Sequence, residues 1–237
     1  MLSIVEITMN GLNLEIKQLL RSENIDFVHF VDISMLDIRQ NRGFPYAILI
    51  GISVNPQFIK MVYDNPNYVH TLNDEYAQTE HRVGLIADKL ADRLIRKGYK
   101  ALSQSDNGLV AENAFDFATK TSVLPHKTIA ILSGIGQIGK NNLFITTEYG
   151  AAQCLGSVLT NAPLSVIQHG IQLPKCNGCN VCRDICPQKA LKGKCWNTNI
   201  SRDEMVNVNE CITCLKCLVH CPKTQIYMKR TLSSNGA

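Results

Sequence analysis

Apolar and polar positions along the first 170 residues follow two different periods, which predicts a mixed α/β region. Apolar side chains recur at helical spacing over 12–20 and again from about Asp74 to Lys97, where Gly98 follows as a C-terminal stop. Short apolar runs suited to strands lie at 25–33, 46–52, 99–102, 127–132 and 155–159. The pattern therefore predicts an N-terminal domain built on a mixed sheet.

Cysteine, rather than periodicity, organises the residues that follow. Eight of the ten cysteines fall in two repeats of one spacing, and only Cys154 and Cys195 lie outside it. The last nine residues, KRTLSSNGA, are polar. We predict three parts: an α/β cofactor and substrate domain over 1–172, a ferredoxin-like domain for two 4Fe-4S clusters over 173–228, and a flexible tail over 229–237.

Each repeat has the form Cys-x2-Cys-x2-Cys-x3-Cys-Pro. The first contains Cys176, Cys179, Cys182 and Cys186, and the second contains Cys211, Cys214, Cys217 and Cys221. Bacterial two-cluster ferredoxins use this spacing, and the fourth cysteine of each run ligates the other cluster. We therefore assign one 4Fe-4S cluster to Cys176, Cys179, Cys182 and Cys221, and the other to Cys211, Cys214, Cys217 and Cys186. Structural zinc is the alternative, since it binds pairs of Cys-x2-Cys. A four-coordinate zinc site does not require a third cysteine at the same spacing or a fourth cysteine before proline, and this sequence has both in each repeat.

Charge and composition narrow the function classes. Lys and Arg number 24 against 20 Asp and Glu, and a net charge of +4 is too small for a dedicated nucleic-acid footprint. No run approaches the roughly 18 apolar residues of a membrane span, and the first residues carry no signal-peptide pattern. We expect a soluble cytoplasmic protein without a membrane partner, whose thiols bind metal rather than form disulfides.

A glycine-rich loop follows the predicted strand at 127–132. It carries the pattern GxGxxG at Gly134, Gly136 and Gly139. NAD binding is one interpretation, but fewer than forty residues separate the loop from the first patterned cysteine, too few for the rest of a dinucleotide-binding half. Glycines would still permit close backbone approach to a planar or phosphorylated ligand.

Several stretches together resemble a known family. They are LPHK at 124–127, GIGQIGKNNL at 134–143, TEYG at 147–150, LTNAPL at 159–164 and the double cysteine motif. In this order they resemble the epoxyqueuosine reductase family, relatives of the reductive dehalogenases, from about residue 70 to 222. The resemblance implies a base-off cobalamin in the α/β domain, whose fold would be like that of flavin-related B12-processing proteins. It also implies electron supply through the clusters from a low-potential donor such as ferredoxin or flavodoxin.

The resemblance also implies roles for individual residues. Gly134, Gly136, Gly139 and Lys140 would bind the cofactor. Asp106 stands nearest to the family's proton-donating aspartate, although the Pro and Glu-Arg that usually follow it are missing here. His126 is a second catalytic candidate, because imidazole exchanges protons near neutral pH. The family's tryptophan in the glycine loop is replaced by Gln137.

These observations predict an iron-sulfur reductase that passes electrons from two clusters to cobalamin to reduce a small molecule or modified nucleoside. Two alternatives remain open: a non-catalytic electron-transfer subunit that docks to a partner, and a reductase with flavin in place of cobalamin. Family members are longer and have a C-terminal repeat region that contributes to tRNA recognition. The length of this chain and its small net charge therefore argue against tRNA as its substrate.

Overall fold

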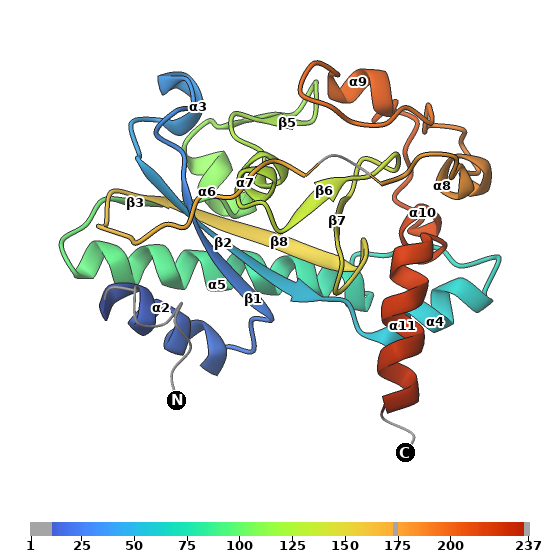
Figure 1. Ribbon diagram of the computed structural model, residues 1–237, viewed down its shortest axis with the longest axis horizontal. Coiled ribbons are helices and arrows are strands. Elements are labelled where there is room, and N and C mark those ends of the chain that lie inside the picture. The colour runs from blue at the N-terminus through green and yellow to red at the C-terminus, as the bar shows by residue number, and fades with distance from the viewer. Residues whose placement is uncertain (1–10, 173–174, 235–237) are drawn as a thin grey trace. The chain divides into compact units, whose positions relative to one another are not determined.

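The computed structural model describes residues 11–172 and 175–234 and has a mixed α/β fold (Figure 1). The helices are α2 (Gly11–Ser22), α3 (Ile38–Asn41), α4 (Pro56–Asp64), α5 (Glu75–Arg96), α6 (Asp106–Ala111), α7 (His126–Leu132), α8 (Val181–Ile185), α9 (Arg202–Met205), α10 (Lys216–Val219) and α11 (Pro222–Ser234). The strands are β1 (Phe27–Asp32), β2 (Tyr46–Ser53), β3 (Ala101–Ser103), β4 (Phe115–Asp116), β5 (Thr121–Ser122), β6 (Gly136–Ile138), β7 (Phe144–Thr146) and β8 (Gln153–Thr160).

The chain forms two compact units from interleaved segments. We call the first the sheet unit; it comprises the residues up to Ile52, Glu80–Ser133 and Leu155–Gly170. The second, the cysteine unit, comprises Ser53–Thr79, Gly134–Cys154 and the residues from Ile171 onward. The sequence predicts two consecutive domains, 1–172 and 173–228, whereas the two compact units interleave along the chain. The assignment of cofactor and substrate binding to the first domain and of the clusters to the second stays a prediction. Its boundary, at 173–174, lies outside the described residues.

A four-stranded sheet in the order β1-β2-β8-β3 is the centre of the sheet unit. Strand β1 pairs antiparallel with β2, and β3 pairs antiparallel with β8. Every side chain of β2 from Ala47 to Ile52 is buried, as expected for an apolar run covered on both faces. Four of the five predicted strands are thus confirmed.

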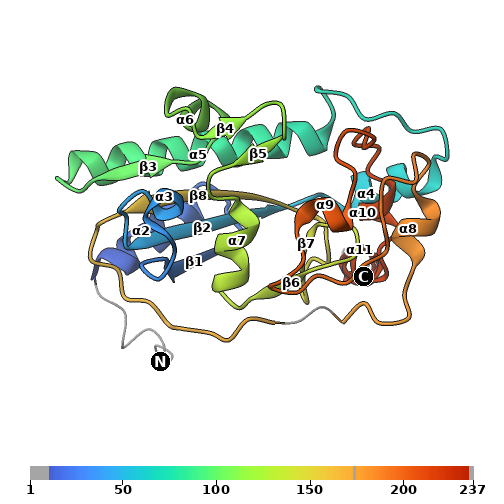
Figure 2. The same ribbon diagram turned by 90° about the horizontal axis from the view of Figure 1, so that it is seen from above.

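Helix α5 runs along this sheet in both views (Figures 1 and 2). Its buried face includes Val83, Ile86, Leu90 and Leu94, the residues whose helical spacing predicts it. Gly98 follows the helix with a φ of +87°, a left-handed conformation typical of a helix stop. The predicted helix is therefore confirmed. No helix within the described ranges is long and apolar enough to cross a membrane.

In the cysteine unit, α11 lies beside α4, and β6 and β7 form an antiparallel hairpin. The Tyr227 hydroxyl of α11 donates to the Val54 carbonyl over 3.1 Å. The Ala151 amide donates to the Thr224 hydroxyl over 3.0 Å. These two buried hydrogen bonds fix α11 to the segments before α4 and after β7.

Two sequence-based predictions are wrong. The segment 127–132, predicted as a strand, belongs to helix α7, because a short apolar run suits a buried helix as well as a strand. The segment 229–234, predicted as part of a flexible tail, belongs to α11. Hydrogen bonds of Thr224 and Tyr227 with residues far away in the sequence hold this helix in place. The polar composition of the segment gives no sign of these contacts. Residues 235–237 of the predicted tail lie outside the described residues.

Replacing Gly150 with alanine is expected to lower the unfolding midpoint of the protein. Gly150 has a φ of +61°, and a Cβ there would lie 2.3 Å from the Thr224 amide nitrogen. The left-handed conformation alone costs roughly 1–2 kcal/mol for a residue with a side chain, and the contact with rigid backbone adds to it. Thermal unfolding followed by circular dichroism measures the effect. Gly170→Ala is the matched control, because a Cβ there meets nothing within 4 Å. Equal midpoints for the two variants would contradict the prediction.

Candidate cluster sites and a polar cavity

The eight patterned cysteines lie in short helices and in the segments directly before and after them. Cys182 lies in α8 and Cys217 in α10, helices of five and four residues. Each helix ends near a cysteine followed by proline, and proline does not continue a regular helix. Thr213 and Leu215, in the loop before α10, have positive φ angles of 51° and 59°. The backbone before α10 therefore turns tightly between Cys211 and Cys217. None of the ten cysteines forms a disulfide within the part of the chain that the structure describes.

Four thiols surround a cavity of about 100 Å³ inside the cysteine unit. They belong to Cys176, Cys179, Cys182 and Cys221. Burial, together with charge repulsion from the other three thiols, raises the pKa of the Cys182 thiol to about 11. The structure thus brings together three cysteines of the first repeat and the last of the second. This is the set that the motif spacing predicts for one cluster.

The second predicted set is also brought together. Burial raises the pKa of the Cys217 thiol, and Cys214 and Cys211 contribute to this shift, followed by Cys182 and Cys186. Cys186 of the first repeat therefore lies within electrostatic reach of the second set. Cys182 acts on Cys217 and on its own set, so the two groups of thiols are neighbours. Crowded, buried thiolates are unfavourable alone, and a bound metal centre would offset their repulsion.

The arrangement of the thiols suits a cluster with several irons. In a 4Fe-4S cluster each cysteine binds a different iron, so the thiols enclose a volume. In a zinc site four donors converge on one ion. Within residues 11–172 and 175–234, no three His, Cys, Asp or Glu side chains form a group that would hold a single metal ion. A cavity lined by four thiols matches the number and kind of ligands that such a cluster needs.

The glycine loop forms the β6–β7 hairpin of the cysteine unit rather than a turn after a strand. Gly134 has a φ of +67°. A Cβ on Gly136 would lie 2.4 Å from the Ile145 carbonyl oxygen, and one on Gly139 would lie 2.3 Å from the Ile145 side chain. The packing of the hairpin therefore accounts for the absence of a side chain at these two glycines. A role of the loop in cofactor binding stays a prediction.

Side chains of this hairpin hold the loops that carry the cysteines. The Lys140 ammonium donates to the Cys179 carbonyl over 2.9 Å and to the Asn180 side-chain oxygen over 3.2 Å. The Asn141 amide donates to the Cys217 carbonyl over 3.2 Å. The hairpin thus contacts one loop from each cysteine repeat. The GxGxxG motif marked the glycines of this segment as important. It gave no indication that Lys140 and Asn141 hold the cysteine loops.

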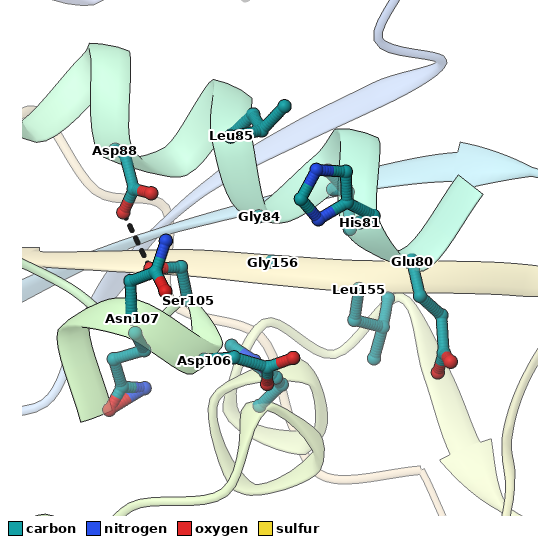
Figure 3. Close-up of a pocket in the computed structure, with 13 residues that line it drawn as sticks. Glu80, His81, Gly84, Leu85, Asp88, Ser105, Asp106, Asn107, Leu155 and Gly156 are labelled. Carbon is teal, nitrogen blue, oxygen red and sulfur yellow. Dashed lines mark hydrogen bonds between the residues drawn. The ribbon is translucent and has the colours of Figure 1, made fainter. Parts of the chain in front are cut away.

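A polar cavity of about 300 Å³ lies within the sheet unit. Figure 3 shows Glu80 and His81 on α5 and Asp106 at the start of α6. His126, at the start of α7, also lines the cavity. Asp106 and His126, the two catalytic candidates from the sequence, therefore share one cavity.

Ser105 positions the start of α6. Its hydroxyl accepts a hydrogen bond from the Gly108 amide over 3.0 Å, which caps the helix, and donates to Asp88 over 2.6 Å (Figure 3). This capping bond satisfies one of the unpaired amides at a helix start. Because Asp106 is the next residue, its backbone is held at the cavity wall. Sequence reasoning did not single out Ser105 or Asp88, because an N-cap serine and a helix-surface aspartate are common.

A chain of polar side chains from the same unit holds the His126 ring. The Gln104 amide donates to the Ser157 hydroxyl oxygen over 2.9 Å, and His126 Nδ1 lies 2.8 Å from the same oxygen. Ser157 thus joins Gln104 to the Nδ1 edge of the imidazole. Burial lowers the pKa of His126 to about 4, although the Asp106 charge acts in the opposite direction. At neutral pH His126 is thus a neutral hydrogen-bond donor. Gln104 and Ser157 gave no sequence signal, being isolated polar residues.

The Cε1–H resonance of His126 is expected to titrate near pH 4 rather than near 6.5. Its folded-state pKa lies below the ordinary value of 6.5. The unfolded chain therefore binds the proton first, and this residue's contribution to stability is complete above about pH 6.5 and lost as the pH falls towards 4. NMR titration, with the resonance assigned through His126→Gln, measures the pKa. A midpoint above 6 would contradict the buried, neutral imidazole.

No protein-family model matches this chain. Among curated proteins, the epoxyqueuosine reductase of Lactococcus garvieae is 25% identical over 153 residues, which cover 62% of this chain and 40% of that protein. The chain thus spans about two-fifths of the length of this relative.

Solved structures share the fold. A reductive dehalogenase, described in a study of B12-dependent dehalogenation, has a TM-score of 0.64 and 17% identity, covering 90% of this chain and 33% of its own. An epoxyqueuosine reductase bound to an epoxyqueuosine-modified tRNA stem loop has a TM-score of 0.53 and 16% identity, covering 91% of this chain and 66% of its own. The overall mixed α/β fold is therefore common to these proteins.

Proposed function

Because this chain is a relative of the epoxyqueuosine reductases in sequence and shares their fold, we propose that it is an iron-sulfur reductase. The observation that carries this proposal is the assembly of Cys221, from the second repeat, with Cys176, Cys179 and Cys182, from the first. Such exchange of the fourth cysteine is typical of two-cluster ferredoxins. We therefore assign the cysteine repeats to a ferredoxin-like module with two 4Fe-4S clusters.

The module passes single electrons along the cysteine unit. Cys182 belongs to one set of thiols and raises the pKa of Cys217 in the other, which supports neighbouring clusters. Neighbouring clusters exchange electrons readily, so the pair acts as a conductor between an external donor and a second cofactor. A low-potential protein such as ferredoxin or flavodoxin suits the donor role, because 4Fe-4S clusters of this type are reduced at low potential.

Cobalamin is the second cofactor that we propose. Its support is the shared fold with a dehalogenase described as B12-dependent. When bound, cobalamin supplies a cobalt centre that is reduced to a strongly nucleophilic state. A Cβ on Gly136 or Gly139 would meet Ile145, so hairpin packing already requires these two glycines and they do not favour one cofactor over another. Flavin is the alternative cofactor, and experiment separates the two.

The polar cavity supplies the proton chemistry. Asp106 is the proposed proton donor, as the resemblance implies. The proposed role of His126 is narrower than general acid–base catalysis: its low pKa keeps the ring neutral, so Nε2–H donates a hydrogen bond to a substrate oxygen. This role requires the tautomer in which Nδ1 accepts a hydrogen bond from the Ser157 hydroxyl, which Gln104 also contacts.

The proposed substrate is a small molecule or a modified nucleoside. The argument against tRNA rested on chain length and net charge, whereas a relative with this fold has been solved with a tRNA stem loop. We therefore retain a tRNA-borne nucleoside as a candidate beside the free nucleoside. Anisotropy titrations with a modified stem loop at physiological salt distinguish them, because a free-nucleoside enzyme would not bind the stem loop in the micromolar range.

Anaerobic purification followed by absorption spectroscopy tests the second cofactor. We expect broad cluster absorption near 400 nm in the isolated protein and a change to the base-off cobalamin spectrum when cobalamin is added. A flavin that co-purifies stoichiometrically would replace cobalamin in the proposal. If the protein binds neither cofactor but passes electrons from its clusters to a partner protein, the chain is an electron-transfer subunit.

A further inference from the structure

We propose that Lys140 raises the reduction potential of the cluster held by Cys176, Cys179, Cys182 and Cys221, and so makes it the electron acceptor of the pair. The inference rests on the proposed clusters. It concerns a residue that the sequence resemblance connected with cofactor binding and that the structure places beside the cysteines instead.

Lys140 is a buried cation at the wall of the cysteine-lined cavity. Only 8% of its surface is exposed. The ammonium donates to the Cys179 carbonyl and to the Asn180 side-chain oxygen, and both acceptors are uncharged. Among the carboxylates that the structure describes, none forms an ion pair with it. A buried charge needs a partner of opposite sign, and an anionic cluster in the neighbouring cavity provides one.

The effect of this charge on the cluster has a definite sign. A cluster with four thiolate ligands is anionic, and it gains one more negative charge when it takes up an electron. A nearby positive charge therefore stabilises the reduced form more than the oxidised form, which raises the potential. Because Lys140 is buried, salt and water screen this interaction weakly.

The other lysines at this cavity are placed differently. Lys175 and Lys223 also line it, but both side chains are exposed. Solvent screens their charges, so they contribute less to the potential. Lys140 therefore makes the larger contribution among the three.

A higher potential for this cluster gives electron flow a direction. One electron leaves the cluster of Cys211, Cys214, Cys217 and Cys186, which is oxidised, and enters the Lys140-side cluster, which is reduced. Electrons from a donor would then collect on the cluster beside the β6–β7 hairpin. The second cofactor is accordingly expected to draw its electrons from that cluster.

The test is a potentiometric titration of the anaerobic protein, followed by electron paramagnetic resonance. Lys140→Gln should shift one of the two cluster midpoints to a more negative potential, while Lys140→Arg should preserve it. Lys223→Gln is the matched control, since it removes an exposed charge from the same cavity. Full iron content with both midpoints unchanged in Lys140→Gln would overturn the proposal. Absence of cluster signals in the wild type would instead refute the proposed function.

A second variant addresses the bracing role of Lys140. If Lys140→Gln loses iron, Asn180→Asp keeps the lysine and adds a negative charge against its ammonium. This variant should also lower the midpoint of the same cluster. The shifting cluster is identified in a Cys217→Ala background, which is expected to retain only the Lys140-side cluster. An unchanged midpoint in Asn180→Asp with full iron content would refute the electrostatic role.

Discussion

Cys186→Ala is expected to remove the cluster built mainly by Cys211, Cys214 and Cys217, and to reduce the iron content from about eight to about four per chain. Cys186 belongs to the first repeat, yet it contributes to the raised pKa of Cys217. Loss of one of four thiolate ligands exposes its iron to water, and a chelator removes iron from such a cluster. Iron determination after anaerobic incubation with a chelator, with the wild type treated in the same way, measures the result.

Paired substitutions decide which cluster Cys186 serves. The double variant Cys186→Ala/Cys217→Ala should keep about four irons, because both changes fall on one cluster. Cys186→Ala/Cys179→Ala should lose nearly all iron, because the changes fall on different clusters. Cys195→Ala is the control; its thiol lies 3.7 Å from the Asn177 side-chain oxygen and outside the repeated spacing, so all iron should remain. The opposite pattern in the double variants would show that the ligands do not cross.

Asp106→Asn is expected to reduce turnover by about 10²- to 10⁴-fold, the usual range for loss of a general acid. The exchange preserves the shape of the side chain and removes its titratable carboxyl group. Because Asp106 lies in the sheet unit, the iron content and cluster spectra should not change. Turnover of an epoxyqueuosine-modified stem loop, and of the free nucleoside, with dithionite as reductant measures the effect.

The control for this variant is Asp92→Asn, an identical exchange on an exposed position of α5. It should leave turnover within about twofold of the wild type, as expected for a surface substitution. If Asp106→Asn retains comparable activity, the proton comes from another group. Glu80 and Asp88, which line the same cavity, would then be the next residues to exchange.

Strong periodicity made part of the fold predictable. The α5 face and the β2 run carry enough apolar positions to determine element type, and both are confirmed. Residues 127–132 are too few to separate a helix from a strand by period. Helix α4 was missed although Asn55 caps it and Pro56 occupies its first turn, a start signal that the sequence contained.

The site was predictable where spacing alone defines it. The cysteine repeats specified which thiols meet, since the pattern encodes a ligand set. The surroundings of Gly136 depend on Ile145, which approaches through hairpin pairing that no short motif shows. Gln104 and Ser157 meet His126 only after the sheet and α7 have formed. Such polar contacts between distant segments leave no pattern in a single sequence.

The central claim is that the cysteine unit holds two 4Fe-4S clusters. Iron, acid-labile sulfide and zinc determined together on the anaerobically purified wild-type protein test it most directly. The account predicts about eight irons and eight sulfides per chain, with only traces of zinc. Stoichiometric zinc with no sulfide, and no broad absorption near 400 nm, would contradict it.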